Sequence, residues 1–219
     1  MSIRADWLRW LIAIILLGEA LVGAFTGRWS LVFVALAALG LSLLPEVFAR
    51  WVGIKLPQSM LAAAAIFIFA TIYLGEAYDF YERLWWWDLV LHFGSALGFG
   101  IIGFLFVFIQ FEGDRYAAPP WAIAFLSATI AISIGVFWEI FEFGMDQIFG
   151  LNMQKSGLVD TMGDLIVDVL GALIGAGAGF LYLKGLQLGG SSAVIEEFVT
   201  LNREWFRKFT KFIDPRQGK

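Results

Sequence analysis

The stretch DLVLHFGSALGFGIIGFLFVFIQF, residues 88–111, decides the fold, because it joins a membrane-length apolar run to two ionisable residues at one end. A hydrocarbon core of about 30 Å requires about 20 helical residues. We therefore expect a transmembrane helix here. The four-residue spacing of Asp88 and His92 places both side chains on one face of that helix, near its start.

Five more stretches of the chain have this length and character. Their apolar runs are long and continuous, which favours helices over the short alternating strands of a membrane barrel. The composition agrees, since 60% of the residues are hydrophobic and only 16% are charged. We therefore predict an all-α, polytopic membrane bundle of six transmembrane helices. The predicted spans are Trp7–Phe25, Trp29–Ala49, Ser59–Tyr78, Asp88–Phe111, Trp121–Phe149 and Asp160–Lys184.

Charge and composition exclude several classes of protein and site. The net charge of −4 has the wrong sign for a nucleic-acid-binding protein. The chain has no cysteine, which excludes disulfides, thiolate metal sites and iron–sulfur clusters. His92 is the single histidine, so centres that need several histidines are excluded as well.

The basic residues predict an orientation. If the N-terminus is cytoplasmic, every Lys and Arg except Arg28, Arg83 and Lys155 falls on the cytoplasmic side of six crossings. The positive-inside rule therefore predicts that both termini are cytoplasmic.

The C-terminal segment differs from the rest of the chain. We expect a six-helix transmembrane domain over 1–188 and a cytoplasmic segment over 189–219, with residues 189–192 (GGSS) breaking the last helix between them. An amphipathic helix is predicted over Ala193–Phe212, lying on the headgroup layer or docked on protein. Its apolar stripe would consist of Val194, Phe198, Leu201, Trp205, Phe209 and Phe212.

Acidic residues gather at the predicted outer ends of the last three spans. An unpaired charge inside a membrane costs about 3 kcal/mol or more, so such residues need partners. These three helices offer no Lys or Arg at the same depth, because Arg83 and Lys155 are in loops. The candidate site residues are Asp88, His92, Glu139, Glu142, Asp164 and Asp168.

Crowded carboxylates can be compensated by protons or by a divalent cation. Oxygen ligands with one imidazole suit Mg²⁺, Mn²⁺, Ca²⁺, Fe²⁺ or Zn²⁺, and the sequence does not choose among these ions. All six residues are candidate metal ligands. His92 and Glu142 are also candidates for proton transfer in catalysis.

Glycines recur on two of these helices. Gly171, Gly175 and Gly179 are spaced by four in the last span, and Gly94, Gly98 and Gly103 lie in the fourth. Such faces permit close helix packing within the bundle, and they also predict a homo-oligomer.

Three strings resemble the YjdF-like family of bacterial inner-membrane proteins: WWWDLVLHF (85–93), WEIFEFGMDQIFGLNMQKSG (138–157) and DTMGDLIVDVLGALIG (160–175). A more distant similarity is to VanZ. The matching positions would be Asp88, His92, Glu139 or Glu142, Gln147 and Asp164, followed by Gly171 and Gly175. This resemblance implies an extracytoplasmic acidic site in a protein of the bacterial inner membrane.

Three functions are compatible with these features. The leading hypothesis is a divalent-metal site that acts on a lipid or lipid-linked substrate at the outer leaflet, with membrane lipids as partners and no nucleic acid. The alternatives are a cation or proton transporter that uses the carboxylates, and a structural subunit of a membrane complex.

Overall fold

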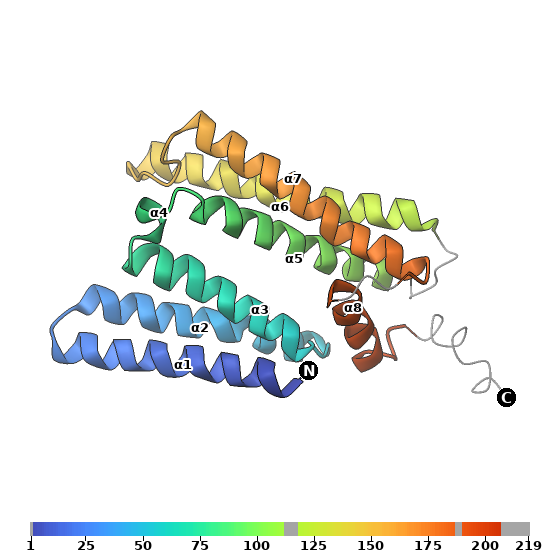
Figure 1. Ribbon diagram of the computed structural model, residues 1–219, viewed down its shortest axis with the longest axis horizontal. Helices are drawn as coiled ribbons and strands as arrows, with labels where there is room; N and C mark the ends of the chain where they lie inside the picture. Colours follow the sequence, from blue (N-terminus) through green and yellow to red (C-terminus); the bar gives the residue numbers. More distant parts are fainter. Residues whose placement is uncertain (1, 112–117, 187–189, 207–219) are drawn as a thin grey trace. The chain divides into compact units, whose positions relative to one another are not determined.

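Six long apolar helices dominate the computed structural model, which describes residues 2–111, 118–186 and 190–206, with side chains from Asp6 onward (Figure 1). The prediction of an all-α membrane protein with six spans is confirmed, and no strand occurs among the described residues. The long helices are α1 Ser2–Phe25, α2 Trp29–Val52, α3 Gln58–Ile68 continued by the π-helix η1 Phe69–Ala77, α5 Trp87–Gln110, α6 Pro120–Phe149 and α7 Leu158–Leu183. Two short helices are α4 Phe80–Arg83 and α8 Gly190–Leu201.

The chain divides into two units, Met1–Trp87 and Asp88–Lys219. This division falls inside the segment predicted as one transmembrane domain, and the boundary at 188 stays a prediction. In the first unit, α1, α2 and α3 with η1 pack through a core that is rich in small residues, including Ala35 and Ala38. Arg9 of α1 pairs with Glu46 of α2 at 2.5 Å, so two charges within these apolar helices compensate one another.

In the second unit, glycines bring helix backbones into near contact. A Cβ atom added at Gly100 of α5 would lie 2.8 Å from the carbonyl oxygen of Ala172 on α7, and one at Gly103 would lie 3.0 Å from that of Ser127 on α6. Added Cβ atoms at Gly171 and Gly175 would collide with the backbone of α5. These four positions therefore fix α5 against α6 and α7.

The glycine prediction is confirmed on α7 and at Gly103 of α5, and it needs correction at Gly94 and Gly98. Gly94 and Gly98 have open space where a side chain would be, and the contact with α7 is made at Gly100, which the pattern did not select. Because Gly171, Gly175 and Gly179 pack against residues of α5, that face is occupied within the chain. The homo-oligomer stays a prediction, for which Gly94 and Gly98 offer a free small-residue surface.

The C-terminal segment forms a helix, but it begins earlier than predicted, and its buried face shares only Phe198 with the described part of the predicted stripe. Residues 190–192 are helical, so the expected break does not occur there. Ile195, Phe198 and Phe206 are buried, and the Phe206 ring lies 5.4 Å from that of Phe108 on α5. The segment therefore docks on its own unit. In the predicted stripe, Leu201 and Trp205 are exposed, whereas Phe209 and Phe212 lie outside the described residues.

Candidate functional site

Three helices of the second unit carry the predicted site residues. Helix α5 contributes Asp88 and His92, α6 contributes Glu139 and Glu142, and α7 contributes Asp164 and Asp168. All lie toward the end of the unit at which α5 and α7 begin and α6 ends (Figure 1). The buried members, with exposed fractions of 1–8%, are Asp164, Asp168, Glu139, Glu142 and His92. Asp88 is partly exposed.

The His92 imidazole is the centre of this cluster. Its Nδ1 atom lies 3.4 Å from Asp168 Oδ2, and its Nε2 atom lies 3.8 Å from both Asp88 Oδ1 and Glu139 Oε1. Side chains from α5, α6 and α7 therefore meet around one ring. The prediction that acids of three consecutive spans converge is confirmed by these distances.

Asp88, His92 and Asp164 form the best arrangement for a metal ion. One candidate ligand atom from each lies within 4.8 Å of the other two. Adjacent ligands of a small octahedral ion are about 3 Å apart, because each lies about 2.1 Å from the metal and at right angles to its neighbours. The three side chains would therefore have to draw closer together to hold such an ion. Glu139, Glu142 and Asp168 do not belong to this triad.

Several buried oxygens in and beside the triad make no hydrogen bond of good geometry. These are both carboxylate oxygens of Glu139 and Oδ2 of Asp164. A buried acceptor without a partner costs about 1–3 kcal/mol, and more when it is charged. Because Glu139 is only 4% exposed and also faces His92, its carboxylate lies where a cation or a proton would compensate it.

Glu142 and the neighbouring Asp146 have partners of their own. Trp138 donates its indole N–H to Glu142 at 2.8 Å. Asp146 accepts the backbone N–H groups of Met153 and Gln154 at 2.7 and 2.9 Å. Asp146 therefore holds the loop after α6 in place. Helix α6 itself ends just before Gly150, which has a left-handed backbone (φ 66°).

The sequence reasoning missed two residues. A Cβ atom at Gly135 of α6 would overlap the Asp168 carboxylate, so this glycine leaves the space in which Asp168 contacts His92. The expectation that no basic residue reaches the acids is wrong for Lys155. This loop residue interacts electrostatically with Asp88 and Asp160. The sequence signal for this interaction was that Lys155 lies in a short loop shortly before Asp160.

Away from the cluster, the three helices are apolar inside. Toward the other end of the unit, the buried side chains of α5, α6 and α7 are Ala, Ile, Leu, Val and Phe apart from Ser127. The Ser127 hydroxyl donates to the carbonyl of Ile123 on its own helix. The described part of the unit thus has its ionisable cluster at one end and no polar path through the middle.

Comparison with known proteins identifies the family. A family model described as "Predicted membrane protein (DUF2238)" matches residues 8–185, and the chain belongs to this family, which includes the YjdF-like proteins. A protein of Thermotoga maritima, described as uncharacterized, is 30% identical over 127 residues, which cover 58% of this chain and 65% of that relative. The chain thus aligns with slightly less than two thirds of the relative's length. No solved structure matches.

Proposed function

We propose that this member of the DUF2238 family binds a divalent cation through Asp88, His92 and Asp164 and uses it to act on a lipid or lipid-linked substrate. The observation that carries the proposal is the Glu139 carboxylate. It is buried, neither oxygen makes a hydrogen bond of good geometry although the Thr161 hydroxyl lies nearby, and Oε1 lies 3.8 Å from His92 Nε2, beside the triad. Buried carboxylates are retained inside membrane helices when something positive compensates them.

The geometry suggests different roles for the carboxylates. Asp168 faces Nδ1 of His92, and a carboxylate in that position orients an imidazole so that the opposite nitrogen, Nε2, can bind a metal. Nε2 is the nitrogen that faces Asp88 and Glu139. We assign Asp88, His92 and Asp164 as ligands, Glu139 as a fourth ligand, and Asp168 as the residue that positions His92.

The acid/base role falls to Glu142. It lies outside the triad, and its hydrogen bond to Trp138 leads toward the apolar surface, where the Trp138 and Phe141 side chains are each 48% exposed and their tilted rings lie 5.4 Å apart. A hydrophobic substrate dissolved in the bilayer would approach the site across this surface. A bound ion would polarise a phosphoryl or carbonyl oxygen of such a substrate, and Glu142 would transfer the proton.

The orientation of the site follows from the distribution of Lys and Arg. With both termini cytoplasmic, the ends of α5, α6 and α7 that carry the cluster belong to the extracytoplasmic side of a bacterial inner membrane. The substrate would then be a component of the outer leaflet. The apolar interior of the unit supports a one-sided site of this kind over a transporter, which would need polar groups along a path.

The test is direct metal analysis of protein purified in detergent without an affinity tag. We expect one tightly held divalent ion per chain by mass spectrometry and an increase in melting temperature when that ion is added. Asp164→Asn and Glu139→Gln should lower both values.

Asp79→Asn is the matched control, because Asp79 is an exposed carboxylate outside the cluster and should leave metal content unchanged. Wild-type protein that holds no ion, and whose melting temperature does not respond to any of the candidate divalent cations, would refute the proposal.

A further inference from the structure

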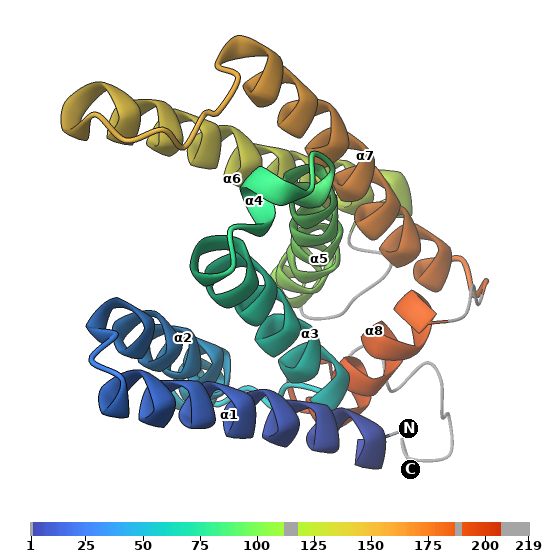
Figure 2. The same ribbon diagram turned by 60° about the vertical axis from the view of Figure 1, so that its left-hand side comes forward.

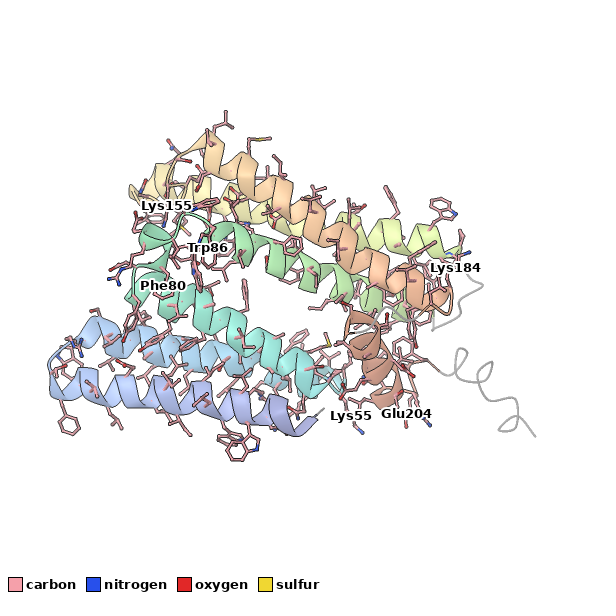
Figure 3. All side chains as sticks on the ribbon, in the orientation of Figure 1. Lys55, Phe80, Trp86, Lys155, Lys184 and Glu204 are labelled. Carbon is pink, nitrogen blue, oxygen red and sulfur yellow. The ribbon has the colours of Figure 1, made fainter. Side chains whose placement is uncertain are left out.

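The loop between α6 and α7 holds Lys155 in a defined place. Asp146 accepts the backbone N–H groups of the two residues before it, Met153 and Gln154. The Gln154 side chain in turn donates to the Thr161 hydroxyl of α7 at 2.6 Å. Lys155 is thus fixed between α6 and the first turn of α7, at the site end of α7, whereas Lys184 marks the other end (Figure 3).

The ammonium group of Lys155 is buried at the end of the unit where the acids gather (Figure 3). Its Nζ atom is shielded from solvent, which is uncommon for lysine. Its charge interacts with the carboxylates of Asp88 and Asp160. In Figure 2 the adjoining ends of α6 and α7 stand apart, and the loop that contains Lys155 connects them.

Two cations could therefore compensate the Asp88 carboxylate, namely a metal ion and the Lys155 ammonium group. It lies 3.8 Å from His92 Nε2 and belongs to the triad that could hold a metal, and it also interacts with Lys155. An ammonium near a carboxylate that binds a divalent ion repels this ion, and the repulsion is strong in a medium of low dielectric constant.

We propose that Lys155 is a built-in counter-ion that competes with the divalent cation for Asp88, compensating the acids when the site is empty and moving away when the ion binds. This inference rests on the proposed function, because it takes the triad as the metal site. It adds a residue that regulates metal affinity and that no metal-ligand pattern would select.

The first test compares Mn²⁺ affinity by titration calorimetry in wild type, Lys155→Met, Lys155→Arg and Lys184→Met. Removal of the competing charge should tighten Mn²⁺ binding about tenfold or more in Lys155→Met. Lys155→Arg keeps the charge and should stay near wild type. Lys184→Met removes the same residue type at the far end of α7 and should not change the affinity.

The second test measures directly how accessible the amine of Lys155 is. An amine-reactive acetylating reagent should modify Lys155 slowly in metal-free protein and faster when Mn²⁺ is present, whereas Lys184 should react equally in both, as measured by peptide mass spectrometry. This test uses wild-type protein and does not depend on how the variants fold.

The outcomes separate the two proposals. If wild type binds Mn²⁺ but Lys155→Met binds it equally or more weakly, and Mn²⁺ leaves Lys155 acetylation unchanged, the counter-ion role is overturned and the metal site stands. If neither wild type nor Lys155→Met binds any divalent ion, both proposals fail. Binding of Mn²⁺ by wild type that becomes tighter in Lys155→Met, but not in Lys155→Arg or Lys184→Met, supports the competition.

Discussion

Gly135 provides the sharpest prediction, because a single methyl group there should act on the site through Asp168. In Gly135→Ala the new Cβ would overlap the Asp168 carboxylate, which is itself buried and cannot swing into solvent. Overpacking of this kind costs about 1–3 kcal/mol. Alanine returns up to about 1 kcal/mol through its higher helix propensity. The net loss in the free energy of unfolding should be about 0–3 kcal/mol.

The effect on metal binding should be larger than the effect on stability. Displacing Asp168 removes the carboxylate that faces His92 Nδ1 at 3.4 Å, and loss of such an orienting group typically lowers metal affinity about 10–100-fold. Titration calorimetry with Mn²⁺ measures the affinity, and denaturant unfolding in detergent measures the stability.

Gly144→Ala on the same helix is the matched control. No atom lies within 4 Å of a Cβ added there, so this variant should be up to about 1 kcal/mol more stable than wild type and should bind Mn²⁺ equally well. In an Asp168→Ala background, Gly135→Ala should no longer be destabilising, because the overlapping carboxylate is gone. If Gly135→Ala behaves like Gly144→Ala in both assays, the role assigned to Asp168 is wrong.

Two further predictions concern the packing that positions the site. Gly175→Ala should lower stability by about 1–3 kcal/mol, because its Cβ would meet the rigid backbone carbonyl of Leu97, whereas Gly177→Ala has open space and should be neutral in the same unfolding assay. Phe206→Ala removes a buried ring that contacts Phe108 and should cost about 3–5 kcal/mol of docking energy, seen as faster tryptic cleavage after Lys184; unchanged cleavage would contradict the docked position of α8.

The spans could be predicted within a few residues because their signal is the length of an apolar run. The third span shows the limit of this signal. Its second half, from Phe69 to Ala77, is a π-helix, and a shift in backbone hydrogen-bond register leaves the apolar pattern unchanged. The glycine faces show another limit, since the spacing of Gly94 and Gly98 resembles a packing motif, yet Gly100 makes the contact.

The site was predictable to the level of residues that share a helix face. The spacing of Asp88 with His92, and of Asp164 with Asp168, required only helical geometry. The separate roles of these residues were not predictable, because they depend on how closely the helix backbones approach one another. Gly135 shows this, since its missing side chain decides where the Asp168 carboxylate can lie.

Lys155 was missed for a different reason. Its position depends on the path of the loop, which is set by hydrogen bonds from Met153 and Gln154 to Asp146. A count of charges by span could not include such tertiary contacts, and it therefore placed this lysine apart from the acids.

Pulsed electron paramagnetic resonance of bound Mn²⁺ tests the central claim most directly. His92 is the single histidine, so in protein without an affinity tag any imidazole nitrogen coupled to Mn²⁺ must belong to it. We predict nitrogen modulation from one directly bound imidazole in wild type and its loss in Asp164→Asn. Mn²⁺ that shows only water and carboxylate coupling, or no bound Mn²⁺ at all, would contradict the assignment of Asp88, His92 and Asp164 as a metal site.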